Sequence, residues 1–145
     1  MKPIHILIVE DNEGDILLIK EAFEEAKLVN DISIVRDGEK AIHFLEKKGE
    51  YGDVKLPDLI ILDVNLPRKN GHEVLEFIKT NDHLMLIPVI MLTTSSSEND
   101  IIKSYKNHAN CYITKPVEVD DFMEAVLEIE EFWISLVKLP TKVHQ

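Results

Sequence analysis

The stretch LIILDVNLP, residues 59–67, combines a continuously apolar run with an aspartate, Asp63, where the run ends. Four apolar residues without polar alternation are typical of a strand that is buried on both faces. Such strands belong to parallel sheets covered by helices. The stretch therefore predicts a central strand of an α/β fold, with Asp63 just beyond its carboxyl end.

Outward from this stretch, four other short apolar runs alternate with longer segments that have helical spacing of apolar residues. The other runs are Ile4–Val9, Ile32–Val35, Val89–Leu92 and Cys111–Ile113. The predicted helices are about Asp15–Lys27, Glu39–Lys48, His72–Thr80, Glu98–Asn107 and Val119–Val137. Five βα units in series predict one doubly wound α/β domain over residues 1–137, with a C-terminal tail at residues 138–145.

The composition excludes several classes of partner. The 145 residues carry a formal net charge of −11, which disfavours direct binding to nucleic acid and to anionic membrane surfaces. No segment approaches the roughly 18 apolar residues of a membrane span, and the apolar run after Lys2 is too short for a signal peptide, so we expect a cytoplasmic protein. The single cysteine, Cys111, cannot form an intramolecular disulfide and is expected to be a buried, inert thiol.

Polar residues that can bind a metal or take part in a reaction follow four of the five runs. They are Glu10 and Asp11, then Asp63, then Thr93, then Lys115. Taken singly, each has an ordinary explanation, such as a helix cap, a turn former, a helix-approach hydroxyl or a solvated lysine. Since the carboxyl ends of parallel strands meet at one rim, where doubly wound folds place their function, we expect all of them in one site.

These residue types together suit metal-assisted phosphoryl transfer. Three carboxylates in one pocket repel one another, and Mg²⁺ would relieve that repulsion with Glu10, Asp11, Asp63 and the backbone carbonyl of Asn65 as ligands. A carboxylate can attack phosphorus to give an acyl phosphate, which makes Asp63 the candidate nucleophile. Lys115 would offset the charge of the incoming group, and the Thr93 hydroxyl could donate to one of its oxygens.

Four motifs in this order resemble the receiver domains of two-component response regulators, which are CheY-like proteins. The motifs are ILIVED at 6–11, LIILDVNLP at 59–67, MLTTS at 91–95 and YITKP at 112–116. The resemblance extends over about residues 4–133. It implies a flavodoxin-like sheet with strand order 2-1-3-4-5 and a histidine kinase as the phosphodonor.

By position, the resemblance implies a role for each site residue. Asp63 would be the phosphoacceptor and Thr93 the switch hydroxyl. Tyr112 would be the aromatic switch residue that moves inward with Thr93. Lys115 would contact the phosphoryl group and precede a cis peptide bond to Pro116. Glu10 stands where many members have aspartate, and Thr94 stands where a small residue is typical, so metal geometry and access to Asp63 differ from the common pattern.

A finer resemblance is to the single-domain regulators that serve bacterial phytochrome histidine kinases. The segments that carry it are GEY at 49–51, LPRKNGHEVL at 66–75, SYKNHANCYITK at 104–115 and EEFWISLVKLP at 130–140. It implies a phytochrome as a candidate kinase. It also implies homodimerisation through the last helix and the region of the strand predicted at Cys111–Ile113.

The end of the chain allows two interpretations. Residues 118–131 hold seven acidic residues and no basic one, which fits either a solvated helix face or a partner surface beside Phe132 and Trp133. About thirty residues remain after Lys115, and the predicted helix and tail use them. We therefore expect output through a changed contact with a downstream protein, or through onward phosphoryl transfer.

Two other functions compete with a signalling switch, which would modify only itself and is not expected to be an enzyme with a separate substrate. Phosphatases of the haloacid-dehalogenase type also use a strand-end aspartate, Mg²⁺, Thr or Ser and Lys. Their nucleophile ends the first strand, whereas Asp63 follows the third predicted strand and Asn65 replaces their second acid. A receiver-like binding module with an inactive site is the other alternative, and the intact set of polar residues disfavours it.

Overall fold

A computed structural model of the chain describes residues 4–25, 30–93, 111–115 and 120–128, together with residues 102, 106, 108, 109 and 118. Its five strands form one parallel sheet in the order β2-β1-β3-β4-β5. The strands are β1 (Ile4–Val9), β2 (Asn30–Val35), β3 (Leu59–Asp63), β4 (Val89–Thr93) and β5 (Cys111–Thr114). The doubly wound fold and its strand order are confirmed, and the order reverses between β1 and β3.

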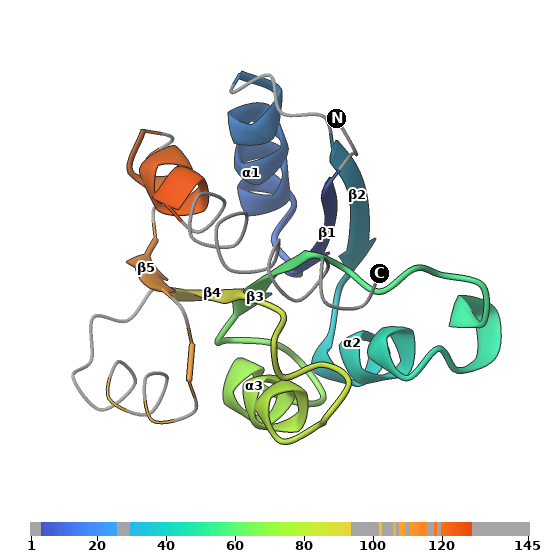
Figure 1. Cartoon of the computed structure of the whole chain (residues 1–145). Helices are drawn as coiled ribbons and strands as arrows, with labels where there is room; N and C mark the ends of the chain where they lie inside the picture. The colour runs from blue at the N-terminus through green and yellow to red at the C-terminus, as the bar shows by residue number, and fades with distance from the viewer. Residues whose placement is uncertain are drawn as a thin grey trace, which may run out of the picture.

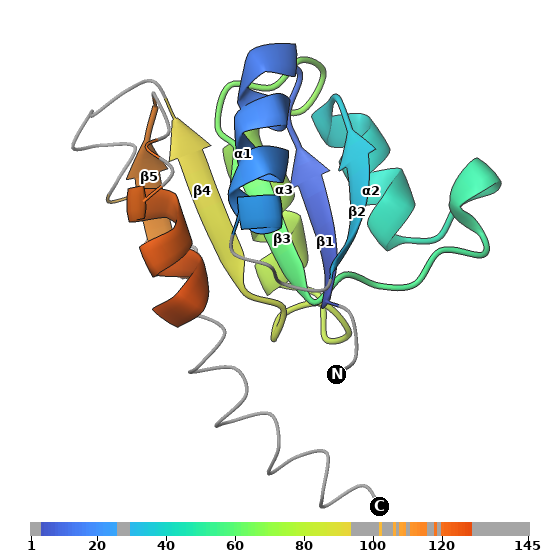
Figure 2. The same ribbon diagram turned by 90° about the horizontal axis from the view of Figure 1, so that it is seen from above.

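Helices cover both faces of the sheet (Figures 1 and 2). Helix α1 (Glu13–Glu25) and the helical residues 120–128 lie on one face, and α2 (Gly38–Leu45) and α3 (Gly71–Lys79) lie on the other. A short 3-10 helix, η1 (Gly49–Tyr51), follows α2. This two-sided cover explains why the central strands are continuously apolar.

Alternate residues of each central strand enter different hydrophobic cores. Leu7 and Leu62 pack into the core beneath α2 and α3, while Ile8 and Ile61 pack into the core beneath α1 and residues 120–128. All four side chains are fully buried. In the parallel ladder Val9 pairs with Leu62, so the carboxyl ends of β1 and β3 lie side by side.

The observed boundaries differ from the predicted ones by at most three residues where they are described, and the largest difference is the end of α2 at Leu45 rather than Lys48. Strands β3 and β4 include Asp63 and Thr93 as their last residues, whereas the prediction placed both just beyond the strands. The predicted last helix is described only at residues 120–128, and the predicted helix at 98–107 only at residues 102 and 106, which are helical. Thr94, Pro116 and residues 129–145 lie outside the described residues.

The structure also bears on the burial of Cys111 and on the presence of membrane-spanning helices. Cys111 is half-buried rather than buried, because β5 is an edge strand of the sheet; burial nonetheless raises the pKa of its thiol. Within the described residues, no helix is long and apolar enough to cross a membrane.

Candidate functional site

The sheet brings the predicted site residues to one rim. Backbone hydrogen bonds continue the pairing just past the strands: Glu10 N donates to Val35 O over 3.1 Å, and Lys115 N donates to Thr93 O over 2.6 Å. The positions of these residues are therefore set by the ladder of the sheet rather than by loop conformation. The rim lies beyond the switch point between β1 and β3, as expected for a doubly wound fold.

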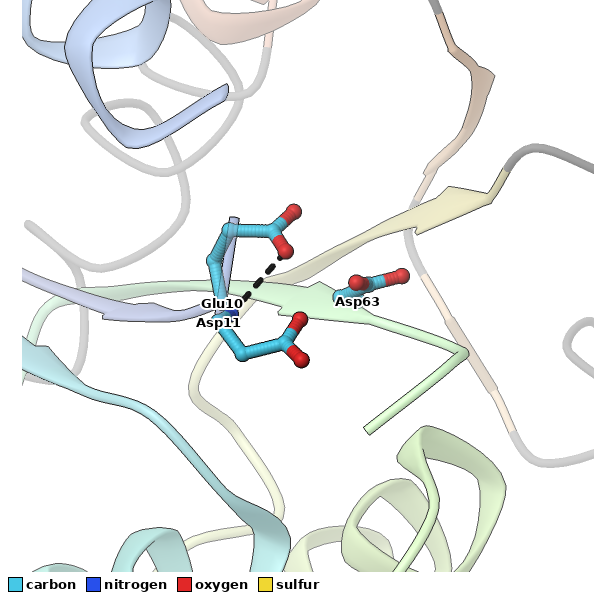
Figure 3. Close-up of side chains that lie close together, drawn as sticks. All are labelled: Glu10, Asp11 and Asp63. Atoms are coloured by element: carbon cyan, nitrogen blue, oxygen red, sulfur yellow. Dashed lines mark hydrogen bonds between the residues drawn. The ribbon is translucent and has the colours of Figure 1, made fainter. Parts of the chain in front are cut away.

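Three carboxylates cluster at this rim (Figure 3). One carboxylate oxygen from each of Glu10, Asp11 and Asp63 lies within 4.8 Å of the others. Glu10 and Asp11 come from the end of β1, and Asp63 from the end of β3. Glu10 is fully buried and Asp63 is 2 % exposed, whereas Asp11 faces solvent. The predicted acidic cluster is thus present, with one member open to the surroundings.

Hydrogen bonds from the backbone orient two of these carboxylates. Glu10 Oε2 accepts from the N–H groups of Asp11 and Asn12, at 3.0 and 3.2 Å. Asp63 Oδ1 accepts from the N–H of Asn65 at 3.0 Å, so Asn65 lies directly beside the cluster. Backbone donors favour the charged form of a carboxylate and fix its direction without adding side-chain freedom.

The ammonium group of Lys115 is the positive centre of the site. Its Nζ lies 2.6 Å from Glu10 Oε1, 2.9 Å from Asp15 Oδ2 and 3.2 Å from Asp63 Oδ2. Burial by itself lowers the pKa of Lys115, but its hydrogen bonds to Glu10 and Asp15 and the charge of Asp63 outweigh burial and hold the pKa above its ordinary value. The side chain, at 8 % exposure, is therefore a buried cation rather than the solvated lysine of the simplest interpretation.

Burial and the neighbouring Asp63 make the charged form of Glu10 unfavourable. Burial raises its pKa to about 7, and a hydrogen bond with Asp63 and the charge of Asp63 act in the same direction. Lys115 and the N–H of Asn12 lower the pKa but do not compensate. One cation is thus not enough for this group of acids, because Glu10 still takes up a proton near neutral pH.

The two predicted switch residues occupy different environments. Thr93 is fully buried at the end of β4. Tyr112 lies on β5 opposite Met91, is half-buried, and packs against the core beneath α2 and α3. Tyr112 is therefore near the site along the sheet but is not part of the ionic cluster.

The segment after β3 depends on one glycine. A Cβ atom on Gly71 would lie 2.2 Å from the backbone oxygen of Asp63 and 2.7 Å from Val64 Cα, so the first residue of α3 can only be glycine in this arrangement. Gly71 N donates to Val64 O, and a capping box between Asn70 and Glu73 begins the helix. The first residue of α3 therefore packs directly on the backbone of Asp63 and Val64.

Sequence reasoning missed Asp15. This residue was predicted only as the start of a helix, and the structure places it in the first turn of α1 with its carboxylate on Lys115. An acid in the first turn of a helix is common because it complements the helix dipole, so the sequence offered no signal that separated the two roles. A helix cap was the ordinary explanation for Asp11, but Asn12 fills that role, since its Oδ1 accepts from the N–H of Asp15.

This donor set fits a hard divalent cation. Carboxylate oxygens are the ligands that Mg²⁺ and related ions prefer, and the raised pKa of Glu10 shows excess negative charge that such an ion would neutralise. Asp63 combines that environment with a neighbouring cation, which is the arrangement needed by a carboxylate that attacks an anionic electrophile.

Comparison with known proteins supplies independent findings. A family model described as "Response regulator receiver domain" matches residues 6–127. Among curated proteins, the chain is 46% identical over 138 residues to the response regulator Rcp1 of Synechocystis sp., covering 95% of this chain and 94% of Rcp1. It is 41% identical to the probable methanogenesis regulatory protein FilR2 of Methanothrix harundinacea, covering 95% and 88% of the two chains.

Solved structures give the same result. The phosphorylated cyanobacterial phytochrome response regulator RcpA matches with a TM-score of 0.81 and 46% identity, covering 92% of this chain and 96% of RcpA. The Mn²⁺-bound form of Rcp1 matches with a TM-score of 0.80 and 45% identity over the same shares of the two chains.

Proposed function

The chain belongs to the response regulator receiver domain family of two-component systems, and from that premise we propose that it is a switch phosphorylated on Asp63. The observation that carries the proposal is the position of Asp63. Its carboxylate lies in the acidic cluster with Glu10 and Asp11 and 3.2 Å from the Lys115 ammonium. A nucleophile, a cation and a candidate metal site thus coincide at one rim.

The reaction follows from these groups. An oxygen of Asp63 forms a bond to phosphorus while the P–N bond of a phosphohistidine, or the P–O bond of acetyl phosphate, breaks. The leaving imidazole or acetate keeps the electron pair of the broken bond. Lys115 offsets the negative charge that the phosphoryl group brings, and the backbone N–H of Asn65 keeps the Asp63 carboxylate oriented during the approach.

Glu10, Asp11, Asp63 and the Asn65 carbonyl would hold Mg²⁺, which would supply further positive charge at the phosphoryl oxygens. One of the matched structures is the Mn²⁺-bound form of Rcp1, which supports a divalent ion in this chain as well. The choice of Mg²⁺ over Mn²⁺ is part of the proposal.

Readout of the phosphorylated state would begin at Thr93. Its buried hydroxyl position at the end of β4 suits a donor to a phosphoryl oxygen on the neighbouring strand, since Asp63 pairs with Leu92 in the sheet. A shift of Thr93 would leave room for Tyr112 to move inward from β5. The result would be a changed surface for a downstream protein partner.

The partners of this chain are inferred from its relatives. We expect a histidine kinase as the donor, and the similarity to the phytochrome regulators Rcp1 and RcpA makes a phytochrome kinase the first one to test. We expect this exchange to take place in the cytoplasm. A homodimer through the last helix and the β5 region is also a proposal, and sedimentation that shows a monomer at high micromolar concentration with and without phosphorylation would contradict it.

The direct test is the intact mass of the protein after incubation with acetyl phosphate and Mg²⁺. We expect a single phosphoryl adduct in the wild type, no adduct in Asp63→Asn, and no adduct when EDTA replaces the metal. Asp53→Asn is the matched control, because Asp53 is an exposed aspartate outside the rim and its variant should behave as wild type. An adduct on Asp63→Asn, or none on the wild type with either acetyl phosphate or a histidine kinase, would overturn the proposal.

A further inference from the structure

We propose that Asp15 is a positioning residue that holds the Lys115 ammonium beside Asp63, an inference that rests on the proposed phosphotransfer function. Asp15 belongs to α1 rather than to a strand end, and its carboxylate lies 2.9 Å from Lys115 Nζ. It therefore connects the helix layer to the lysine that faces the phosphoacceptor.

Three carboxylates surround the ammonium group of Lys115, and the contact with Asp63 is a hydrogen bond. An ammonium group has three N–H donors, and the structure places one carboxylate oxygen from each of Glu10, Asp15 and Asp63 within 3.2 Å of Nζ. The Asp15 contact is the second shortest of the three. Three contacts in different directions fix the position of a group that would otherwise move on a flexible four-carbon side chain.

Asp15 differs from the other two partners in what a divalent cation would do to it. Among the described residues, Glu10 and Asp63 belong to the acidic cluster that could hold such an ion, together with Asp11. A cation there would neutralise these two partners of Lys115 and repel the ammonium. Asp15 contributes its carboxylate from outside that cluster, so it keeps a full negative charge for Lys115 in the metal-loaded state.

The backbone of Asp15 is well fixed for this role. Asn12 Oδ1 accepts from Asp15 N at 2.9 Å, and Asn12 O accepts from Ile16 N at 3.0 Å, which anchors the first turn of α1. Ile16 and Ile19 are buried in the core beneath this helix. The Asp15 carboxylate is only 19 % exposed, so water screens its contact with Lys115 less than it screens a surface ion pair.

The test compares Asp15→Asn with Glu13→Gln. Glu13 is also an acid in the first turn of α1, but it is exposed and pairs with Arg36, so it controls for the loss of a first-turn acid. The first measurement is the NMR order parameter of the Lys115 side chain in metal-free protein. The second is the rate constant for phosphorylation by acetyl phosphate at saturating Mg²⁺, with thermal unfolding to verify that each variant is folded.

We expect Asp15→Asn to lower the order parameter of Lys115 and to slow phosphorylation about tenfold, as for the loss of one hydrogen bond between charged groups. Glu13→Gln should match the wild type in both measurements. Asp15→Glu keeps the charge on a longer side chain and should recover most of the rate, which a purely structural role would not produce.

Several outcomes would overturn the inference. If Asp15→Asn has the Lys115 order parameter and the phosphorylation rate of the wild type, Glu10 and Asp63 are enough to hold the lysine in place. Faster phosphorylation of Asp15→Asn would mean that Asp15 competes with the phosphoryl group for Lys115 instead of positioning the lysine. If the wild type takes up no phosphoryl group, the proposed function fails, whereas an unchanged Lys115 order parameter in Asp15→Asn refutes the positioning role alone.

Discussion

Lys115 and Lys79 lie at opposite ends of the sheet, and both are shielded from water. They differ in the groups that surround the ammonium and in the direction of their pKa shifts. Lys115, at the carboxyl end of the strands, contacts three carboxylates, and its pKa lies above the ordinary value. Lys79, at the end of α3, donates to the backbone oxygens of Met85 and Ile87, and burial lowers its pKa to about 8. Formal negative charges compensate a buried ammonium, whereas carbonyl dipoles satisfy its hydrogen bonds but leave the charge unfavourable.

The difference separates the proposed phosphorylation site from a structural contact. At the Lys115 end, each charge is balanced against several others, so a metal ion or a phosphoryl group can change the balance. At the other end, the ammonium of Lys79 only links the end of α3 to the segment before β4, through its hydrogen bond to Ile87 O. Four predictions test this contrast, and they are ordered by the size of the expected effect.

The largest effect is expected for Lys115→Met without metal. The substitution leaves the Glu10, Asp15 and Asp63 carboxylates without their cation in a buried site, and breaking a buried ion pair in this way costs about 3 kcal/mol. Urea unfolding at pH 7.5 in EDTA measures the loss. Added Mg²⁺ should recover more stability in the variant than in the wild type. If the variant and the wild type have the same urea midpoint in EDTA, Lys115 does not stabilise the three carboxylates.

The second effect concerns Glu10 and pH. Its pKa is about 7 in the folded protein and 4.5 as the ordinary value, so the folded state binds the extra proton between these two pH values. Stability from this group is fully present below about pH 4.5 and is lost as pH rises through about 7, by up to about 3 kcal/mol. Unfolding of the wild type and Glu10→Gln in EDTA should show the variant gaining relative stability over this range. A constant difference between the two proteins would contradict the raised pKa.

The third effect is expected at the opposite end of the sheet, for Lys79→Met. Loss of the two hydrogen bonds to Met85 and Ile87 should lower the free energy of unfolding by about 1 kcal/mol near pH 10, where the unfavourable charge of the buried ammonium no longer offsets them. Because the pKa of Lys79 is lower in the folded state than its ordinary 10.5, the unfolded chain binds more protons between about pH 8 and 10.5. Wild-type stability should rise with pH in that window through this group. A parallel pH profile in Lys79→Met would refute the assignment to Lys79.

The central strands and the rim could be predicted because burial on both faces leaves a strong pattern in the sequence. Leu59–Leu62 carries no polar alternation, and the structure accounts for this through one core on each side of the sheet. Parallel topology then brings the residues after each strand together without any knowledge of their contacts. For this reason Glu10, Asp63, Thr93 and Lys115 were located by position alone.

The depth of burial and the partners of Lys115 could not be predicted in the same way. The sequence does not show that Glu10 is fully buried or that Asp15 reaches across from α1, since both depend on how the helix layer docks on the sheet. Likewise, the half-exposed state of Cys111 follows from its place in an edge strand rather than from its apolar neighbours. Contacts between layers are set by packing geometry, which periodicity along one segment does not encode.

The smallest effect is expected for Lys48→Gln, which supplies an exposed reference for the two buried lysines. Lys48 Nζ lies 3.2 Å from Glu46 Oε1, a distance equal to that between Lys115 and Asp63, but its side chain is 64 % exposed. Water and salt screen such a pair, so its loss should change the free energy of unfolding by less than about 0.5 kcal/mol. Urea unfolding at low and high salt measures this. A loss comparable to that in Lys79→Met would mean that distance rather than burial decides what a lysine contributes here.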